Sequence, residues 1–214
     1  TVNTLTGKWS SYGCDCALTE SGKRKIRQAL SPAKSQRPKQ ERSWIYKDDN
    51  DFELIKVNRI DSGDGKRKFW QESLIDREPP RELSKRVKPY KYKEAIRALA
   101  EGHEYVFWVE GESCVDAMWR INLPAITTLG GSKFKPERDS NLFPAEKVVV
   151  VPDLDQVGIK HAKNIEHHYQ GCKVLHPFPD HHHWQNPPKD GGIDIADWIG
   201  SGASETDIYK ALKT

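Results

Sequence analysis

Carboxylate side chains follow three predicted strands of this chain, at the point where each strand ends. Glu110-Gly111-Glu112 follows the apolar run 105–109, Asp153 and Asp155 follow the four valines 148–151, and Asp194 and Asp197 follow the segment near 193. A carboxylate next to a buried strand must face solvent, find a partner or bind a cation, because burying it alone is costly. Carboxylate oxygens are ligands that magnesium and manganese prefer. These acids therefore predict a divalent-cation site.

Asp153 and Asp155 form the centre of the predicted site. They are two residues apart in a segment expected to be extended, so their side chains should point the same way and share one hard cation. Glu110, from a neighbouring strand, would add a further oxygen. The alternative is that each acid only caps a strand or the next helix. That alternative explains one acid more easily than three groups of acids.

Strand-like and helix-like segments alternate after residue 93, and this pattern places the acids. Short apolar runs typical of buried strands occur at 105–109, 124–128, 148–151 and 173–175. Between them, helical spacing relates Ile96 to Leu99 and Ala100, and Gly158 to Ala162, Ile165 and Tyr169. The alternation predicts an α/β fold, a Rossmann-like parallel sheet of about four strands with helices on both faces. Ligands of such sheets bind at the carboxyl ends of the strands, where the acids stand.

A different pattern precedes this region. Aromatic and β-branched runs near 44–46, 52–60 and 68–71 are separated by Asp, Asn and Gly, which is typical of an antiparallel meander. Residues 1–43 have no sustained periodicity. We therefore expect three parts, which are a basic, largely irregular lead-in (1–43), a small β-rich subdomain (44–92) and the α/β domain (93–214).

The composition limits the class of protein. Of the 214 residues, 36% are hydrophobic and 30% are charged, which favours one core with solvated segments. No window approaches the roughly 18 consecutive apolar residues of a membrane span, so we expect a soluble, cytoplasmic protein with no membrane partner. Met118 is the only methionine, which indicates a piece of a longer chain.

Transition-metal sites are not expected from the sequence. The four cysteines form one C-x-C and two isolated thiols, without the paired C-x-x-C of a zinc ribbon. His181-His182-His183 is interpreted as a surface loop, on the argument that consecutive side chains cannot all face one ion. No zinc is therefore expected in this chain.

Two basic segments suit a single-stranded nucleic acid. Lys and Arg recur between residues 23 and 42, where Glu41 is the only acid. In the second segment cations alternate with aromatic rings, and its members are Lys85, Arg86, Lys88, Tyr90, Lys91, Tyr92 and Lys93. Positive charge follows a phosphate backbone and aromatic rings stack on bases. The alternative is that both segments are solvated linkers.

The ordered motifs resemble a known family. Val109-Glu110-Gly111-Glu112, Asp153-x-Asp155-x-x-Gly158 and Asp194-Ile-Ala-Asp197-Trp198 together resemble the Toprim domain of bacterial-type primases, topoisomerases and some nucleases. Within that group the likeness is to the phage- and plasmid-borne primases, and it covers roughly residues 44–200. Cellular primases carry an aspartate four residues after the motif glutamate. Here Cys114 holds that position, and Asp116 follows two residues later.

The resemblance implies a nucleotidyltransferase of DNA replication, which makes RNA primers on a single-stranded DNA template from ribonucleoside triphosphates. It implies one or two Mg²⁺ or Mn²⁺ ions and a helicase domain or subunit outside this chain. Asp153 and Asp155 would be metal ligands, and Asp194 or Asp197 would complete the coordination shell. Glu110 would be a general base or a further ligand, and Glu112 and Asp116 are possible additional acids.

The glycines and one lysine complete the predicted site. Gly111 and Gly158 would permit close approach of the backbone, and the loop Gly130-Gly131-Ser132-Lys133 offers amides and an ammonium group to phosphate. Two other functions remain as alternatives, and only the first would use the same acids. One is a metal-dependent Toprim nuclease, and the other is a catalytically degenerate Toprim module that only binds nucleic acid.

Overall fold

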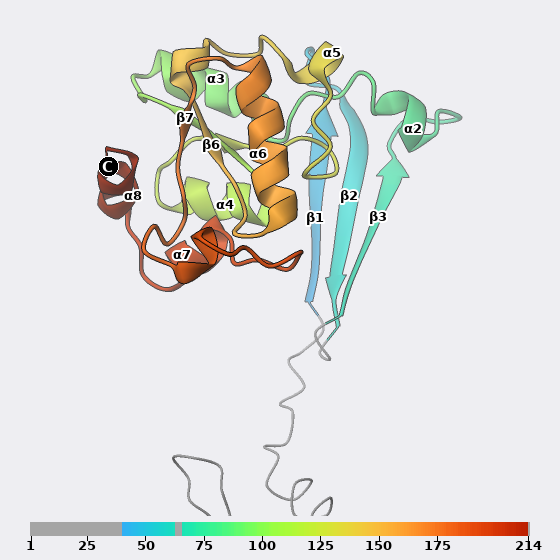
Figure 1. The fold of residues 1–214 in the computed structure, drawn as a ribbon. Helices are drawn as coiled ribbons and strands as arrows, with labels where there is room; N and C mark the ends of the chain where they lie inside the picture. Colours follow the sequence, from blue (N-terminus) through green and yellow to red (C-terminus); the bar gives the residue numbers. More distant parts are fainter. Residues whose placement is uncertain (1–39, 63–65, 214) are drawn as a thin grey trace, which may run out of the picture. The chain divides into compact units, whose positions relative to one another are not determined.

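The computed structural model describes residues 40–62 and 66–213 (Figure 1). Arg42–Asn58 and Phe69–Thr214 belong to one compact unit, whereas Gln40, Glu41 and Arg59–Lys68 belong to a second. The first basic segment lies outside the described residues up to residue 39. The larger unit holds every site residue discussed below.

The first sheet has three antiparallel strands in the order β1-β2-β3, namely β1 (Gln40–Lys47), β2 (Glu53–Asp61) and β3 (Arg67–Ser73) (Figure 1). Asp48 makes the first turn, since its Oδ1 accepts hydrogen bonds from the backbone amides of Asn50 (2.8 Å) and Phe52 (3.0 Å). Asp51 adopts a positive φ of 64° there. Asx side chains favour such turns, and the predicted meander is confirmed.

The second sheet has four parallel strands in the order β5-β4-β6-β7. They are β4 (Val106–Val109), β5 (Ala125–Ile126), β6 (Val148–Val151) and β7 (Lys173–Val174). All residues of β4, β5 and β6 are buried. Strands that are covered on both faces read as continuous apolar runs, which is why the sequence located them.

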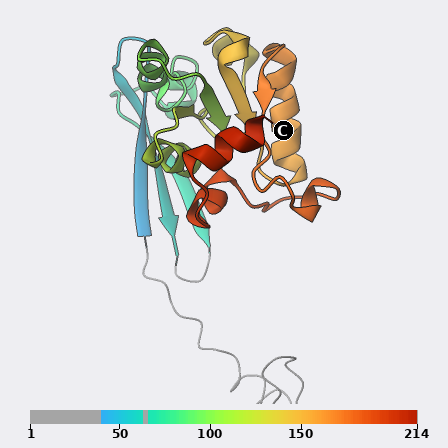
Figure 2. The same cartoon turned by 90° about the vertical axis from the view of Figure 1, so that its left-hand side faces the viewer.

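Helices cover both faces of this sheet (Figures 1 and 2). The longer ones are α3 (Tyr92–Ala100), α4 (Glu112–Arg120), α6 (Gln156–His168), α7 (Ile195–Gly200) and α8 (Glu205–Leu212). The short ones are α2 (Pro80–Leu83), α5 (Pro136–Asp139) and the 3₁₀ turns η2 (Ala145–Lys147) and η3 (His182–Trp184). One core cluster joins Phe107 and Val149 to α4, α7 and α8, and another joins Trp108 and Val150 to α3 and α6. The predicted α/β class is confirmed.

One predicted helix face was wrong. The sequence pattern put Ile96 on the buried face of α3, but Ile96 is 39% exposed, and Ala95 and Ala98 are buried instead. Ala95 belongs to the same buried cluster as Trp108. No helix in residues 40–62 and 66–213 is long and apolar enough to cross a membrane.

Buried hydrogen bonds attach β1 to α4 within the larger unit. The hydroxyl of Tyr46, a fully buried residue, donates to Oε1 of Glu112 at 2.8 Å. The indole of Trp44 donates to Oδ2 of Asp116 at 2.7 Å. Burial, followed by the charge of Glu112, raises the pKa of Tyr46 well above its usual value, so the phenol stays protonated and donates. These contacts fix the β-rich part on the helix that follows Glu110.

We expect Tyr46→Phe to lower the free energy of unfolding by about 1–3 kcal/mol, because Glu112 then keeps a buried oxygen without this donor. For a chain of this size, that is a fall in Tm of about 2–4 °C per kcal/mol in thermal unfolding. Tyr92→Phe is the matched control, since Tyr92 is half-buried and packs its ring against Phe143. Equal effects of the two substitutions would contradict a special role for the Tyr46 hydroxyl.

Candidate active site

The parallel register of β4 and β6 sets the position of the central acids. Val109, the last residue of β4, lies opposite Val151, the last residue of β6. Glu110 follows β4 directly, and Asp153 follows β6 after one residue. Because adjacent parallel strands end at the same edge of a sheet, both carboxylates are presented at that edge.

The pKa values show that these acids interact. Burial, followed by the charges of Glu110, Asp194, Asp155 and Asp197 in that order, raises the pKa of Asp153 to about 9. Burial also raises the pKa of Glu110 to about 6, with contributions from Asp155 and Asp194. The fold thus gathers the acids that the sequence singled out into one partly desolvated, mutually repelling group. We call Glu110, Asp153 and Asp194 the acid cluster.

Asp155 has a structural task of its own. Its Oδ1 accepts a hydrogen bond from the amide of Gly158 at 2.8 Å, which caps α6, and its Oδ2 accepts from the amide of Gly192 at 2.9 Å. Its own amide donates to the carbonyl oxygen of Asp153 at 2.8 Å, so the chain turns here. The expected extended segment is therefore interrupted by a turn, and both carboxylate oxygens of Asp155 accept hydrogen bonds from backbone amides, while its charge still acts on Glu110 and Asp153.

Asp194 and Asp197 form the capping box of α7. Asp194 accepts a hydrogen bond from the amide of Asp197 at 2.9 Å, and Asp197 accepts from the amide of Asp194 at 3.1 Å. Asp197 is exposed, whereas burial raises the pKa of Asp194. Asp194 thus caps a helix and also belongs to the acid cluster.

The other two acids of this region face the antiparallel sheet. Glu112 accepts its hydrogen bond from Tyr46, and Asp116 accepts from Trp44 and from the hydroxyl of Tyr90 at 3.1 Å. Cys114, which is 2% exposed, faces the acid cluster instead, since burial and then the charges of Asp194 and Asp153 raise its pKa. Asp116 therefore does not fill the position that Cys114 occupies.

Two glycines bring backbone segments close beneath the site. A Cβ atom on Gly158 would lie 2.6 Å from the carbonyl oxygen of Asp153, and one on Gly192 would lie 2.4 Å from that of Leu154. Gly111 has a φ of 89°, and its amide donates to the hydroxyl of Thr127 at 3.1 Å. Sequence analysis anticipated the close approach at Gly158 but missed Gly192 and Thr127, whose roles depend on contacts across the fold. At Gly111 a Cβ would meet nothing within 4 Å, so the close approach expected there is not seen between described residues.

A cavity of about 660 Å³ opens beside Glu110. Residues of the α/β domain and of β2 and β3 line it, namely Glu110, Gly111, Glu112, Gly130, Gly131, Lys133, Val57, Phe69, Trp70 and Gln71. Gly131 is close to the acid, since a Cβ on it would lie 3.4 Å from Cγ of Glu110. The sequence predicted the glycine loop and Lys133 but not the strand residues, because alternation within a strand does not tell which face meets the other domain.

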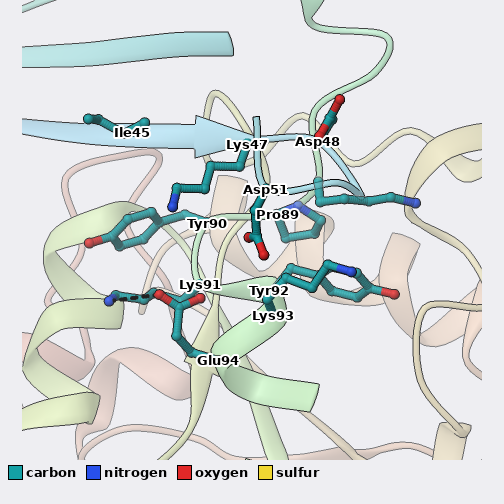
Figure 3. Close-up of a pocket in the computed structure, with 11 residues that line it drawn as sticks. Ile45, Lys47, Asp48, Asp51, Pro89, Tyr90, Lys91, Tyr92, Lys93 and Glu94 are labelled. Carbon is teal, nitrogen blue, oxygen red and sulfur yellow. Dashed lines mark hydrogen bonds and ion pairs between the residues drawn. The ribbon is translucent and has the colours of Figure 1, made fainter. Parts of the chain in front are cut away.

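Acids neutralise most of the second basic segment. Ion pairs join Lys85 to Glu82 (2.5 Å), Arg86 to Glu78 (2.6 Å), Lys88 to Asp49 (2.9 Å) and Lys91 to Glu94 (3.1 Å). Figure 3 shows the small pocket that Lys47, Lys91, Lys93, Tyr90 and Tyr92 line with Glu94 and other residues. Burial and then the charge of Asp116 raise the pKa of Tyr90 well above its usual value, and its ring packs 5.9 Å from that of Tyr46. Tyr90 therefore has a structural role in this fold.

The three consecutive histidines lie closer together than the sequence analysis expected. Among the described residues, His181, His182 and His183 form the one group of at least three His, Cys, Asp or Glu residues whose ligand atoms all lie within 4.8 Å of one another. Neighbouring side chains were expected to diverge, but His181 caps the 3₁₀ turn η3 and His182 and His183 begin it, and their ring centroids lie 4.3–4.6 Å apart. The carboxylate oxygens of the acid cluster do not all lie within 4.8 Å of one another.

The fold is that of a Toprim-like primase core, and comparisons with solved structures support this class. The chain is similar to the primase catalytic core of Escherichia coli, with 15% identity and a TM-score of 0.52 over 80% of this chain and 51% of that one. It is also similar to a DNA primase domain from Pseudomonas aeruginosa, with 17% identity and a TM-score of 0.51 over 79% and 49% of the two chains.

A DnaG primase catalytic domain bound to single-stranded DNA is similar as well, with 16% identity and a TM-score of 0.51 over 79% of this chain and 52% of that one. This chain thus spans about half the length of the structures it matches. No protein-family model and no curated protein matches the sequence. The resemblance drawn from the motifs is confirmed at the level of the fold.

We expect Gly158→Ala to destabilise the chain by about 1–3 kcal/mol, because the added methyl group meets backbone atoms of Asp153 that cannot move freely. Gly200→Ala is the matched control, since Gly200 also lies in a helix and a Cβ on it meets nothing within 4 Å. Thermal unfolding of both variants tests this close approach, and equal stability of the two would contradict it.

We expect Asp153→Asn to stabilise the metal-free protein at neutral pH by about 1–3 kcal/mol, because asparagine is neutral without a proton, whereas the Asp153 carboxyl must take up a proton when the chain folds at this pH. The folded protein holds the Asp153 proton to a pKa of about 9, against an ordinary value of 3.8. The wild type should therefore lose stability as pH rises from about 4 to 9, and the variant should lose less.

Denaturant titrations in chelator at several pH values measure this difference. Asp76→Asn is the control, because the Asp76 side chain is 93% exposed. A variant that is less stable than the wild type at pH 8 would contradict the electrostatic interpretation of the acid cluster.

Proposed function

We propose that this chain is the catalytic part of a DNA primase, which joins ribonucleotides into primers on single-stranded DNA. The observation that carries the proposal is the acid cluster, held at the carboxyl ends of β4 and β6 in a fold similar to primase catalytic cores. Metal-dependent nucleotidyl transfer is the chemistry for which such a cluster is suited.

The donor set fits Mg²⁺ or Mn²⁺. Oε2 of Glu110 is buried and has no hydrogen-bond partner among the described residues, and Asp153 sits where a cation would offset four neighbouring charges. Glu110 and Asp153 would hold the ion with Asp194, while Asp155 and Asp197 would serve mainly through the caps described above. When bound, one or two such ions neutralise the triphosphate and acidify the attacking 3′ hydroxyl.

The residues of the chain would supply a proton acceptor and a phosphate site. With a pKa of about 6, Glu110 is mostly ionised at pH 7.5, so its unpartnered Oε2 can serve either as a metal ligand or as the acceptor of the hydroxyl proton. The loop Gly130–Lys133 lies beside Glu110 and would hold the triphosphate through its amides and the Lys133 ammonium. The cavity provides room for the nucleotide.

The template would follow the basic segments. A similar primase domain is described as bound to single-stranded DNA, and this supports the same ligand for this chain. Since Lys85, Arg86, Lys88 and Lys91 are ion-paired, DNA phosphates would have to compete with their acidic partners. On the resemblance to phage and plasmid primases, a helicase domain or subunit is the expected protein partner, and the cytoplasm the expected location.

Cys114 supports a second candidate. It faces the acid cluster where cellular primases carry a carboxylate, so a degenerate Toprim module that only binds nucleic acid is the alternative. A Toprim nuclease would use the same acids for cleavage. Incubation with single-stranded DNA, labelled ribonucleotides and Mg²⁺ or Mn²⁺ separates the three functions by synthesis, cleavage or neither.

We expect Glu110→Gln to lower primer synthesis by about two to four orders of magnitude, because the amide cannot accept the proton or offer a charged ligand. Fold and DNA binding should persist, as judged by circular dichroism and fluorescence anisotropy. Glu137→Gln, at the exposed start of α5, is the control and should retain wild-type activity. Near wild-type synthesis by the Glu110 variant would remove Glu110 from the mechanism.

A further inference from the structure

His181, His182 and His183, which we call the histidine turn, lie in the loop between β7 and α7 (Figure 1). Hydrogen bonds within this loop hold the backbone of the turn. The indole of Trp184 donates to the carbonyl oxygens of Pro177 (2.9 Å) and Phe178 (3.2 Å). The amide of His181 donates to the carbonyl of Phe178 at 2.8 Å, and the amide of Trp184 to that of His181 at 3.1 Å. The backbone that carries the three rings is therefore fixed before any ligand binds.

The rings face one another closely. The centroids of His181 and His182 lie 4.6 Å apart with the rings stacked at 24°. His183 meets both nearly edge-on, at 4.5 Å from His181 and 4.3 Å from His182. One ligand atom from each residue lies within 4.8 Å of the others, and His182 is exposed, which gives an ion access from solvent.

From this geometry we propose that His181, His182 and His183 bind one transition-metal cation of the zinc type, at a site separate from the acid cluster. Three imidazoles and a water complete a tetrahedral shell, with nitrogens about 3.4 Å apart for Zn–N bonds of about 2.05 Å. Rotation of side chains on a fixed backbone closes the remaining distance. Nδ1 of His181 now accepts a weak hydrogen bond from the amide of His183 at 3.2 Å, which the ion would replace.

The ligand type selects the ion. Imidazole nitrogens favour zinc, nickel, cobalt and copper over magnesium, whereas the carboxylates of the acid cluster have the opposite preference. The two sites would therefore fill independently in a mixture of Mg²⁺ and Zn²⁺. The expectation of no zinc rested on the cysteine spacing and on the misjudged ring geometry.

The site is connected to the acid cluster through the loop. After η3 the loop continues to Pro188, whose carbonyl accepts from the amide of Gln156, and to Gly192, whose amide Asp155 holds. The ring of Phe178 also packs 5.9 Å from that of Trp198 on α7. An ion at the histidines would thus stabilise the segment that carries the partner of Asp155, a structural role that does not depend on the proposed function.

Zinc binding to the full chain tests the proposal. Zn²⁺ is titrated by calorimetry in excess Mg²⁺ into the wild type and into H181Q/H182Q/H183Q, and Co²⁺ replaces Zn²⁺ to report tetrahedral nitrogen ligation by visible absorption. We expect the triple variant to bind one Zn²⁺ fewer per chain and to lose the Co²⁺ bands. Loss of an outer-shell partner already weakens metal sites by about 10–100-fold, so each single variant should weaken binding by at least about tenfold.

H167Q/H168Q is the matched control, because these adjacent histidines end α6 with their rings 5.1 Å apart. It should bind Zn²⁺ like the wild type. Unchanged stoichiometry in the triple variant, or an equal loss in the control, would overturn the proposal. The single variant H182Q keeps the test valid if the triple variant misfolds, since His182 is exposed and its replacement leaves the scaffold bonds in place.

Discussion

The parallel pairing of β4 with β6 is the constraint on which the site depends. It places Glu110 and Asp153 at one edge of a sheet that is covered by helices on both faces. Partial desolvation and mutual repulsion then raise their pKa values. A cation bound between these carboxylates would offset their repulsion and so lower the free energy of the site. The packing of the rest of the domain keeps the carboxylates together.

Most of the nearby acids maintain the structure around this pair. Asp155 binds two backbone amides, and Glu112 and Asp116 accept hydrogen bonds from aromatic side chains. Each of these carboxylates is satisfied by the protein itself, whereas Oε2 of Glu110 has no hydrogen-bond partner in the part of the chain that the structure describes. Acids of the same type, a few residues apart, therefore divide into those that hold the fold together and those that are left for a ligand.

The two proposed metal sites differ in a related way. The acid cluster depends on contacts between distant strands and remains more open than a preformed cage, as expected for hard cations that keep several waters. The histidine turn depends on three adjacent residues and a local scaffold around Trp184. The acid cluster is assembled by the tertiary fold and the histidine turn by a single loop, so the two proposed sites would differ in the ions they prefer.

The sequence by itself determined the strands, the α/β class and the acids at the strand ends, because buried parallel strands appear as apolar runs and the residues after them reach the site. Only the tertiary structure decided the role of each acid. Asp155 accepts a hydrogen bond from the amide of Gly192, which is 37 residues away. Asp116 accepts one from Trp44, which is 72 residues away, and so does not replace Cys114. The positions of Phe69 and Trp70 beside Glu110, and the convergence of the histidine rings on η3, depend likewise on backbone geometry that residue spacing does not contain.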